Sequence, residues 1–431
     1  MGTHNDALLD RYQRSVLGVF GRPPLVLSHG DGCWVWDVDG NRYLDLVGGI
    51  AVNALGHGHP ALVAAVSKQA AEAIHVSNLF TSPAQVELAE RILQVAEAPE
   101  GSAVFFANSG AEAIEAAIKL SRRTGRSGIV AAEGAFHGRT TGALALTHKA
   151  AYREPFEPLI PGVTHVPYGD EDALRAAVTD ETAAVVLEPV QGEAGVLSPG
   201  PAYLRLAREL TTAHGALLVV DEIQTGVGRT GTWFAFQQAG IVPDAMTLAK
   251  GLGGGVPIGA LVTFGREVSG MLTVGQHGST FGGNPLAAAA GLAVLETIES
   301  QGLLAHVREV GEHLAEAVTG LGHPLVTGVR GAGLLRAITL AADVAPAVAA
   351  AAREGGFIVN PVAPNALRLA PPLVITTEQV DLFVAALPAF LDAASTPAGA
   401  TPAGTNPAGT NPAGTNPAGT NPAGTTPKET A

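Results

Sequence analysis

The stretch Ala216-Leu217-Leu218-Val219-Val220-Asp221-Glu222-Ile223-Gln224-Thr225-Gly226 decides the fold class of this chain. Its unbroken apolar run ends in a carboxylate and a turn, which is typical of a strand buried on both faces of a sheet. Similar short apolar runs occur at 103–106, 129–132 and 183–187, with helix-like segments between them. Strands of this kind that alternate with helices indicate a mainly parallel sheet covered on both faces, so we predict an α/β fold.

Composition narrows the possible partners. The 431 residues are 47% hydrophobic and carry 25 basic against 39 acidic side chains, a net charge of −14. A chain with this negative net charge is not expected to attract nucleic acid or an anionic membrane. We therefore expect a small soluble substrate. The single cysteine, Cys33, excludes an intrachain disulfide, and the first residues lack the pattern of a signal peptide. We predict a cytoplasmic protein.

The pattern along the chain predicts several parts. Residues 60–295 contain the apolar strands and intervening helices of a large domain. Residues 296–394 contain amphipathic helices and short strands, which are typical of a smaller α/β domain. Residues 1–59 mix turn signals with short alternating stretches, and we predict a β-rich segment that joins the small domain.

The end of the chain, residues 395–431, repeats Thr-Asn-Pro-Ala-Gly and contains almost no large apolar residue. A segment so rich in proline and glycine cannot bury enough surface to offset the entropy lost on ordering, so we predict a disordered tail. A role for the repeats as a spacer or a partner-binding element is the alternative.

Two residues indicate the chemistry. Asp221 stands at the carboxyl end of its strand, where ligands of parallel sheets usually bind, and Ile223 shares its face. Ile223 would cover a planar ring whose nitrogen Asp221 keeps protonated. Lys250 ends an apolar run and enters the glycine-rich loop 251–255, so burial should lower the pKa of its amine and free it to attack an aldehyde. Together these groups indicate a pyridoxal 5'-phosphate enzyme.

Each of these residues also has a plainer interpretation. Asp221 could cap a turn, and a lone lysine is more often a solvated surface charge. The glycines after Lys250 could belong to a dinucleotide-binding loop, but Val256 and Pro257 stand where that loop needs a glycine and a helix start. Glu222 should face away from the site, in a structural contact.

Residues 108–113, Asn-Ser-Gly-Ala-Glu-Ala, follow the strand at 103–106 and precede a helix expected from 114 to 121. Small residues at a helix N-terminus let backbone N–H groups close on a phosphate, and the helix dipole adds attraction. An ordinary strand-to-helix turn capped by Ser109 is the alternative.

A further motif, Phe136-His137-Gly138-Arg139, follows the strand at 129–132. Phe136 is placed to stack on the ring face opposite Ile223, and Arg139 to clamp a carboxylate with two hydrogen bonds. A core aromatic residue and a surface arginine are the alternatives. His57 and His59 have no Cys or carboxylate cluster at ligand spacing, so we predict no metal site.

From about residue 12 to residue 391, the chain resembles the class III, fold type I aminotransferases, most closely the acetylornithine aminotransferases. The resemblance rests on the family's spacing of Asp221 and Lys250 and on ordered motifs. These motifs lie at 49–57, 77–80, 108–113, 136–139, 188–193, 221–226, 250–252, 278–285 and 367–369. The resemblance implies a large domain that binds pyridoxal 5'-phosphate on a mainly parallel, seven-stranded sheet, plus a smaller α/β domain.

The resemblance also implies contacts with the cofactor. Gly110 and Ala111 would form the backbone phosphate cradle, Ser109 would also bind the cofactor, and Gln224 would contact the phenolic oxygen of the ring. Thr280 would reach the phosphate bound by the neighbouring subunit. Active sites shared in this way imply an obligate homodimer.

The family carries out two half-reactions, one with an ω-amino donor and one with glutamate. By resemblance, Glu193 would neutralise Arg368 in the first half-reaction and release it to bind the α-carboxylate of glutamate in the second. Arg139 would hold the far carboxylate in both, and Ser279 would add a substrate contact. Ala194 replaces the glycine that commonly follows this glutamate, and should restrict its movement.

Gly49 stands where ornithine aminotransferases typically have a tyrosine, and the lost bulk leaves room for an N-acyl group. We therefore expect transfer of the δ-amino group of N2-acetylornithine to 2-oxoglutarate, in arginine biosynthesis. The alternative donors within the family are succinyldiaminopimelate, succinylornithine, ornithine and 4-aminobutyrate. A pyridoxal phosphate aminomutase or racemase, and a binding protein without activity, are alternatives from other classes.

Overall fold

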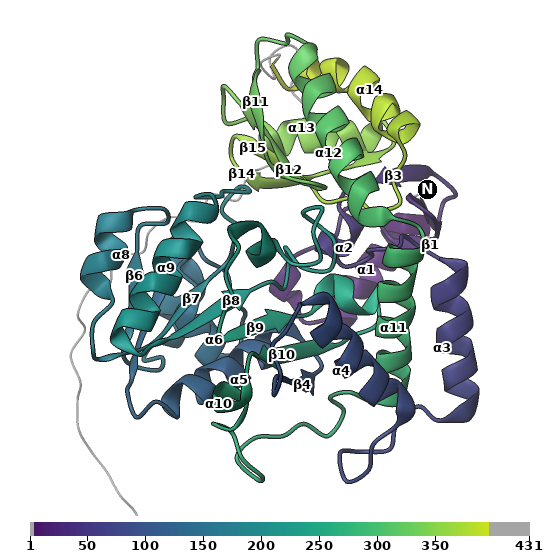
Figure 1. Ribbon diagram of the computed structural model, residues 1–431. Coiled ribbons are helices and arrows are strands. Elements are labelled where there is room, and N and C mark those ends of the chain that lie inside the picture. Colours follow the sequence, from purple (N-terminus) through teal and green to yellow (C-terminus); the bar gives the residue numbers. More distant parts are fainter. Residues whose placement is uncertain (1–3, 396–431) are drawn as a thin grey trace, which may run out of the picture. The chain divides into compact units, whose positions relative to one another are not determined.

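The computed structural model describes residues 4–395 (Figure 1). Within these residues, a seven-stranded sheet is accompanied by two four-stranded sheets. The predicted tail lies outside the described residues, apart from Ser395, which ends the last helix. No helix within residues 4–395 is both long and apolar enough to cross a lipid bilayer.

The strands and helices have the following bounds. The strands are β1 (Leu27–Asp31), β2 (Trp34–Asp37), β3 (Arg42–Asp45), β4 (Ala103–Ala107), β5 (Gly128–Ala132), β6 (Val163–Val166), β7 (Thr182–Leu187), β8 (Leu217–Asp221), β9 (Ala245–Leu248), β10 (Gly259–Thr263), β11 (Val326–Ala332), β12 (Leu335–Leu340), β13 (Phe357–Ile358), β14 (Asn360–Ala363) and β15 (Ala366–Leu369). The helices are α1 (His4–Ser15), α2 (Gly48–Ala51), α3 (Pro60–Glu72), α4 (Pro83–Val95), α5 (Gly110–Arg122), α6 (Thr141–Leu146), α7 (Ala150–Arg153), α8 (Glu171–Ala177), α9 (Pro201–His214), α10 (Arg266–Ser269), α11 (Pro285–Ser300), α12 (Leu303–Gly320), α13 (Ala345–Glu354) and α14 (Thr377–Ser395). The 3₁₀ turns are η1 (Gly18–Phe20), η2 (Glu154–Phe156), η3 (Ala235–Ala239) and η4 (Lys250–Gly253).

The large sheet has the strand order β4-β10-β9-β8-β7-β5-β6. Neighbouring strands from β9 to β6 pair in parallel, whereas β10 runs antiparallel to both β9 and β4. β4 therefore runs in the direction of the parallel strands, so every strand of this sheet except β10 ends at the same edge. The predicted α/β fold with a mainly parallel, seven-stranded sheet is confirmed.

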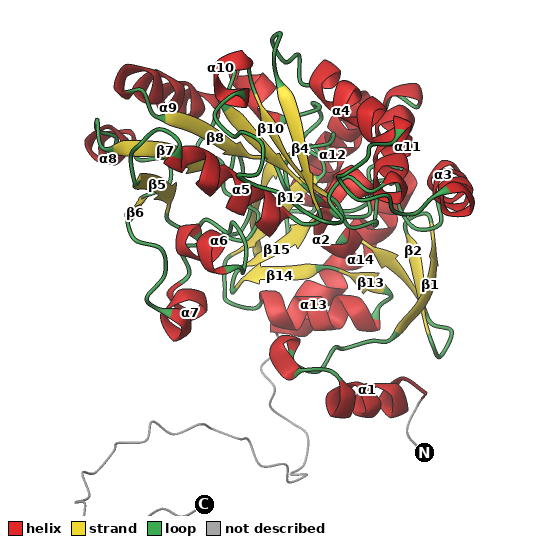
Figure 2. Cartoon of the chain, turned by 90° about the horizontal axis from the view of Figure 1, so that it is seen from below, coloured by secondary structure: helices red, strands yellow, loops and turns green. Residues whose placement is uncertain are grey.

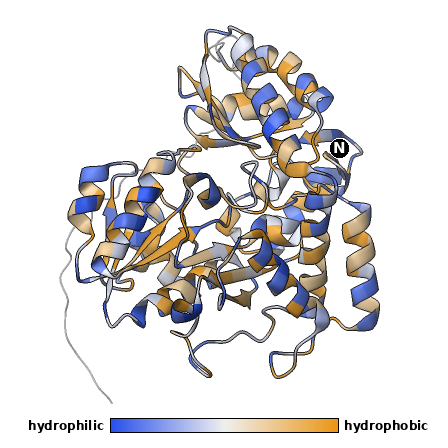
Figure 3. Cartoon of the chain, in the orientation of Figure 1, coloured by the Kyte–Doolittle hydropathy of each residue, from blue (hydrophilic) through white to orange (hydrophobic). Residues whose placement is uncertain are grey.

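Helices cover both faces of this sheet. α8 and α9 pack against β6, β7 and β8, and α5 and α6 lie on the other side (Figure 2). Alternate residues of β8 enter two separate cores, with Leu218 and Val220 in one and Leu217 and Val219 in the other. Burial on both faces explains why these strands are unbroken apolar runs, which are coloured as hydrophobic in Figure 3.

The N-terminal strands pair with a strand from the other end of the described chain. Their sheet has the order β1-β2-β3-β13, and β13 is parallel to β3, with Leu44 opposite Phe357. The remaining sheet, β11-β12-β15-β14, is antiparallel and carries Arg368 on β15. The predicted division into domains stays a prediction, because the chain up to Ser395 forms one compact unit.

One helix begins earlier than the sequence predicted. α5 begins at Gly110 instead of residue 114, because the Ser109 hydroxyl accepts the N–H of Glu112 at 3.2 Å and caps the helix. The earlier start brings the first helical turn to the end of β4, and so to the edge where the parallel strands end.

Candidate active site

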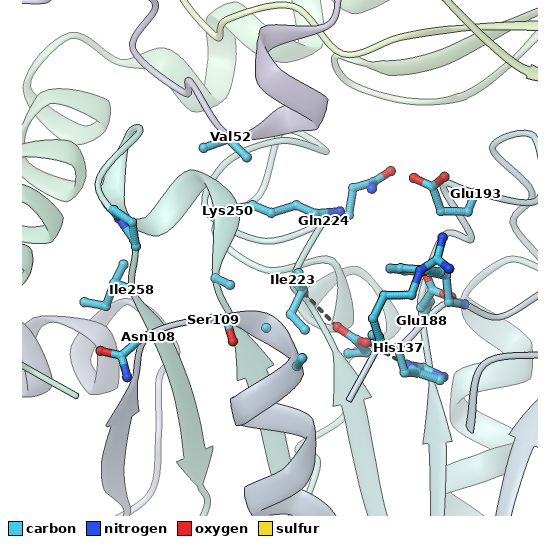
Figure 4. A pocket seen from close by; sticks show the side chains of 18 of the residues that line it. Val52, Asn108, Ser109, His137, Glu188, Glu193, Ile223, Gln224, Lys250 and Ile258 are labelled. Atoms are coloured by element: carbon cyan, nitrogen blue, oxygen red, sulfur yellow. Dashed lines mark hydrogen bonds and ion pairs between the residues drawn. The ribbon is translucent and has the colours of Figure 1, made fainter. Parts of the chain in front are cut away.

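Five side chains come together at the carboxyl edge of the large sheet. Asp221 is the last residue of β8, Glu188 directly follows β7, and Ser109 and Lys250 come shortly after β4 and β9. His137 lies in the loop after β5. Figure 4 shows Ser109, His137, Glu188 and Lys250 around one cavity beyond these strand ends. This edge is the usual ligand position in parallel sheets.

The cavity has a volume of about 410 Å³, which is typical of small-molecule sites. Most residues predicted from the sequence line it, namely Ser109, Gly110, Ala111, Phe136, Arg139, Glu193, Asp221, Ile223, Gln224 and Lys250. His137, Glu188 and Val52 line it as well, although the sequence assigned them no role. In the described chain, Arg368, Ser279 and Thr280 lie outside the lining.

The first turn of α5 leaves two backbone donors for an anion. Ser109 caps the helix, and the Glu112 carboxylate accepts the N–H of Asn108 at 2.7 Å. The N–H groups of Gly110 and Ala111 have no partner within the helix, and both residues line the cavity. A Cβ on Gly110 would lie 2.7 Å from Ile223 Cδ1, so any larger residue here would displace the Ile223 side chain. The Ser109 cap and a phosphate cradle are therefore compatible.

Asp221 is buried and held by three donors. Its Oδ1 accepts the N–H of Ile223 at 3.0 Å and the hydroxyl of Thr247 at 3.2 Å, and its Oδ2 pairs with His137 Nδ1 at 2.7 Å. Burial opposes a charge on His137, but the hydrogen bond and the charge of Asp221 outweigh burial and raise the pKa of His137. The carboxylate is thus fixed in position, with acceptor capacity left for a protonated ring nitrogen.

Lys250 begins η4 with a φ of +40°. This left-handed conformation is unfavourable for a residue with a side chain, and such strain concentrates at functional sites. Burial lowers the pKa of the Lys250 amine, although the nearby Glu193 carboxylate opposes the shift. More of the amine is therefore unprotonated at neutral pH, as attack on an aldehyde requires. Its side chain extends toward Gln224 in Figure 4.

Glu188 places a second carboxyl group in the cavity wall. Its Oε1 accepts the N–H of Phe136 at 3.0 Å. Burial raises the pKa of Glu188 to about 7; the charge of His137 opposes this shift, and that of Asp221 adds to it. The raised pKa favours the protonated form of Glu188, which limits the negative charge next to Asp221.

Arg368 forms an ion pair with Glu193. Its guanidinium also donates to Gln224 Oε1 at 3.2 Å and to Asn360 Oδ1 at 2.9 Å. The Arg368 side chain is 2% exposed and that of Glu193 is 37% exposed, so Glu193 is the partner with room to move. Burial alone would raise the pKa of Glu193, but the charge of Arg368 outweighs burial and lowers it.

Arg139 is exposed and stacks on aromatic rings instead of pairing with an acid. Its Cζ lies 3.6 Å from the ring centroid of Tyr152 and 5.6 Å from that of Phe136. Arg139 forms no salt bridge with any residue between 4 and 395, so its N–H donors remain available to a substrate carboxylate.

Ser279 and Thr280 lie in the loop before α11. The Ser279 hydroxyl accepts a hydrogen bond from Asn108 Nδ2 at 3.1 Å and another from the N–H of Gly282 at 3.0 Å. Thr280 is exposed. The substrate contact of Ser279 and the phosphate contact of Thr280 stay predictions, which would require this loop to reach a second subunit.

Gly49 likewise lies outside the cavity, whose nearest lining residue in sequence is Val52. Gly49 is exposed and has a φ of +65°, a conformation that side chains rarely adopt. Its effect on an N-acyl group stays a prediction, because a larger residue here would add backbone strain as well as bulk.

One of the two histidines considered as metal ligands, His57, is paired with a carboxylate. His57 Nε2 pairs with Asp45 Oδ2 at 2.9 Å. Across residues 4–395, no group of three or more His, Cys, Asp or Glu side chains is arranged to hold a metal ion.

This arrangement at the sheet edge has the features of a fold type I pyridoxal phosphate enzyme, and comparison with known proteins gives the family. Residues 20–391 match the sequence model described as aminotransferase class-III. The chain is 55% identical over 395 residues to the acetylornithine aminotransferase of Streptomyces coelicolor, covering 91% of this chain and 98% of that protein. It therefore belongs to the class III aminotransferase family.

Two solved structures show the same fold. The ornithine aminotransferase of Toxoplasma gondii has a TM-score of 0.86 at 31% identity, with 91% of this chain and 96% of that chain covered. The acetylornithine aminotransferase of Elizabethkingia anophelis has a TM-score of 0.80 at 34% identity, with 90% and 99% covered.

The residues around the cavity fit the family's cofactor, pyridoxal 5'-phosphate. The free N–H groups of Gly110 and Ala111 suit its phosphate, the fixed carboxylate of Asp221 suits a protonated ring nitrogen, and the Lys250 amine suits the aldehyde. Class III aminotransferases depend on this cofactor, so the chain is a pyridoxal phosphate-dependent aminotransferase.

Proposed function

We propose that this enzyme transfers the δ-amino group of N2-acetylornithine to 2-oxoglutarate, giving N-acetylglutamate 5-semialdehyde and glutamate in arginine biosynthesis. The observation that carries the proposal is the Glu193 and Arg368 ion pair, which lies close to Arg139, a residue with no acidic partner in the described part of the chain. Arg368 is neutralised by Glu193, whereas the N–H donors of Arg139 are available. This combination suits an enzyme that alternates between a donor with one carboxylate and an acceptor with two. Relatives named acetylornithine aminotransferase, 52–55% identical over 91–92% of the chain, support this donor.

Several residues would prepare the cofactor. When bound, pyridoxal 5'-phosphate acts as an electron sink for the bond that breaks at the amine-bearing carbon. Asp221 would keep the ring nitrogen protonated, and His137 holds Asp221 in position. Ile223 and Phe136 would cover the two faces of the ring.

Lys250 would carry the proton. The pKa of its amine is lowered by burial. The amine would take the proton from the amine-bearing carbon of the donor and deliver it to the carbon that receives the amino group. The Lys250 side chain extends toward Gln224, so its amine lies among the residues that would hold the cofactor (Figure 4).

Two arginines would distinguish the half-reactions. In the first, the carboxylate of acetylornithine would bind Arg139 while Glu193 neutralises Arg368. In the second, Glu193 would turn away, and Arg368 would bind the α-carboxylate of glutamate with Arg139 on the distal one. Asn360 and Gln224 hold Arg368 in place, so the movement belongs to the more exposed Glu193.

We further propose that the enzyme works in the cytoplasm as a homodimer with shared active sites. Leu79, Phe80 and Phe281 are large apolar side chains that are 87%, 72% and 59% exposed, and exposed apolar patches often mark protein interfaces. The segment with Leu79 and Phe80 is hydrogen-bonded to the segment with Phe281, because Asn78 Nδ2 donates to the carbonyl of Ser279 at 2.7 Å. A second subunit would cover this surface and receive the neighbouring Thr280.

The test is the specificity constant, kcat/KM, for a panel of donors with 2-oxoglutarate. Acetylornithine should exceed ornithine about 10- to 100-fold, the discrimination that one substituent in a shaped pocket provides. The constants for succinylornithine and succinyldiaminopimelate would show whether the site accepts a larger acyl group. The constant for 4-aminobutyrate would show whether the substituents on the α-carbon are needed. Equal constants for ornithine and acetylornithine would leave a broad ω-aminotransferase as the function.

Gly49 can be tested in the same assay. Gly49→Tyr should shift the preference toward ornithine, because the ring fills space and offers a hydroxyl. Since Gly49 has a φ of +65°, Gly49→Ala is the matched control, which carries the backbone strain without the bulk. A similar shift in both variants would assign the effect to strain.

A further inference from the structure

Two cations lie against one aromatic ring next to the active site. Tyr152 is in the short helix α7, which packs beside α6 (Figure 2). The Arg139 Cζ lies 3.6 Å from the ring centroid of Tyr152. The Lys149 Nζ lies 4.7 Å from the same centroid and 3.5 Å from the Tyr152 hydroxyl. Tyr152 itself lies outside the cavity lining, whereas Arg139 is part of it.

The stacking on Tyr152 restricts the conformations of the Arg139 side chain before a substrate binds. An exposed arginine without an acidic partner samples many rotamers, and the freedom it loses on binding a substrate reduces affinity. The face of Tyr152 attracts the guanidinium without using any of its N–H donors. Phe136 meets the Tyr152 ring edge-on, at 6.4 Å between centroids and an interplanar angle of 85°, which limits movement of that ring.

We infer that Tyr152 is a positioning residue, which holds the Arg139 guanidinium ready for a substrate carboxylate. Lys149 adds a second positive charge at the same ring. Neither cation has an acidic partner within residues 4–395, in a chain whose net charge is −14, so the local field favours a dianion such as 2-oxoglutarate. The inference rests on the proposed role of Arg139 in substrate binding.

Glutarate, a dicarboxylate without a reactive carbonyl, gives a binding readout with the holoenzyme. Its Kd, from spectral titration, should rise about 2- to 5-fold in Tyr152→Leu, the fold-change to which an exposed cation–π contact corresponds. The KM for 2-oxoglutarate should rise similarly while kcat stays within about twofold. Tyr152→Phe retains the ring and should match the wild type.

A double-variant cycle separates positioning from a general structural effect. Arg139→Ala should raise the Kd for glutarate more than about tenfold, because it removes a charge-assisted bidentate contact. Tyr152→Leu should then have no further effect in the Arg139→Ala background, since the inferred positioning acts through Arg139, and Lys149→Ala in the same cycle measures the separate contribution of Lys149. The melting temperature and cofactor content of every variant should stay at wild-type values; Tyr152→Met replaces Tyr152→Leu if the latter does not fold.

The possible outcomes are distinguishable. An unchanged Kd in Tyr152→Leu, an equal loss in Tyr152→Phe, or a Tyr152→Leu effect that persists without Arg139 would each overturn the inference. If Arg139→Ala alone leaves glutarate binding unchanged, the proposed role of Arg139 in substrate binding fails as well. If Arg139→Ala weakens binding and Tyr152→Leu does not, only the positioning role of Tyr152 fails.

Discussion

Among single residues, Lys250 concentrates the chemistry, because it combines a left-handed backbone with an amine whose pKa burial lowers. Lys250→Ala should lose the borohydride-reducible attachment of the cofactor. Turnover should fall at least about 10²- to 10⁴-fold, the usual contribution of a positioned proton-transfer group. Lys68→Ala, which removes an exposed lysine of α3, is the control and should behave as the wild type. An unchanged spectrum in Lys250→Ala would reject the assignment.

The ion pair of Glu193 and Arg368 predicts an asymmetry between the half-reactions. In single-turnover measurements, Arg368→Ala should slow the reaction with glutamate about 10- to 100-fold more than that with acetylornithine, because a hydrogen-bonded charge is lost in only one of them. Since this variant leaves Glu193 without its partner, the double variant Glu193→Gln Arg368→Ala is the control. Equal slowing of both half-reactions would exclude the switch.

Sequence alone predicted the cavity residues that belong to recognisable motifs, such as Asp221 and Lys250. It did not predict the contact between His137 and Asp221, which are 84 positions apart, because strand order decides which loops meet. The pKa shift of Glu188 to about 7 was missed for a related reason, since burial is a property of the folded chain. The stacking of Arg139 on Tyr152 depends on side-chain conformations that no spacing encodes.

Among the elements, the turn that leaves β8 makes a prediction about stability. Glu222, as expected, faces away from the cavity and accepts the hydroxyl of Thr225 and the N–H of Phe236, which joins the turn to η3. Burial raises the pKa of Glu222 to about 7. Below the unfolded-state pKa the carboxyl group is protonated in both states; above pH 7 the folded state must bear a buried charge.

The free energy of unfolding should therefore fall by about 3 kcal/mol between pH 4.5 and pH 8 through Glu222 alone. Glu222→Gln keeps the size of the side chain and one acceptor oxygen and removes the charge, so the pH dependence of the difference between wild type and variant isolates this contribution. Denaturant unfolding of the holoenzyme at several pH values measures it. A difference that does not vary with pH would mean that Glu222 titrates normally.

In the large sheet, the strands that the sequence predicted have apolar residues on both faces. The runs at 183–187 and 216–220 correspond to β7 and β8 within one residue at either end. β6 was missed because it lies at the edge of the sheet, where Thr164 and His165 interrupt the apolar pattern. The antiparallel direction of β10 was not predictable either, since the residues of a strand buried on both faces look alike in both directions.

For the whole molecule, the C-terminal repeats are the first test. The family match ends at residue 391 and the compact unit at Ser395, so truncation after Ser395 removes nothing that the described fold contains. The melting temperature, the oligomeric state and the turnover should all stay within error of the full chain. A decrease in any of them would show that the repeats contribute to the folded enzyme.

Assembly is the second test at this scale, because the proposed role of Thr280, which is exposed, requires that it reach the cofactor site of a neighbouring subunit. Thr280→Glu would place a negative charge against the neighbour's cofactor phosphate, and Lys250→Ala removes the reactive amine. Each variant alone should be nearly inactive. In a hybrid dimer, the site that retains Lys250 receives an intact Thr280 from the other chain, so mixed subunits should recover about a quarter of wild-type turnover. If Thr280 served its own chain, the retained Lys250 would still face Glu at position 280, and mixing would restore no activity.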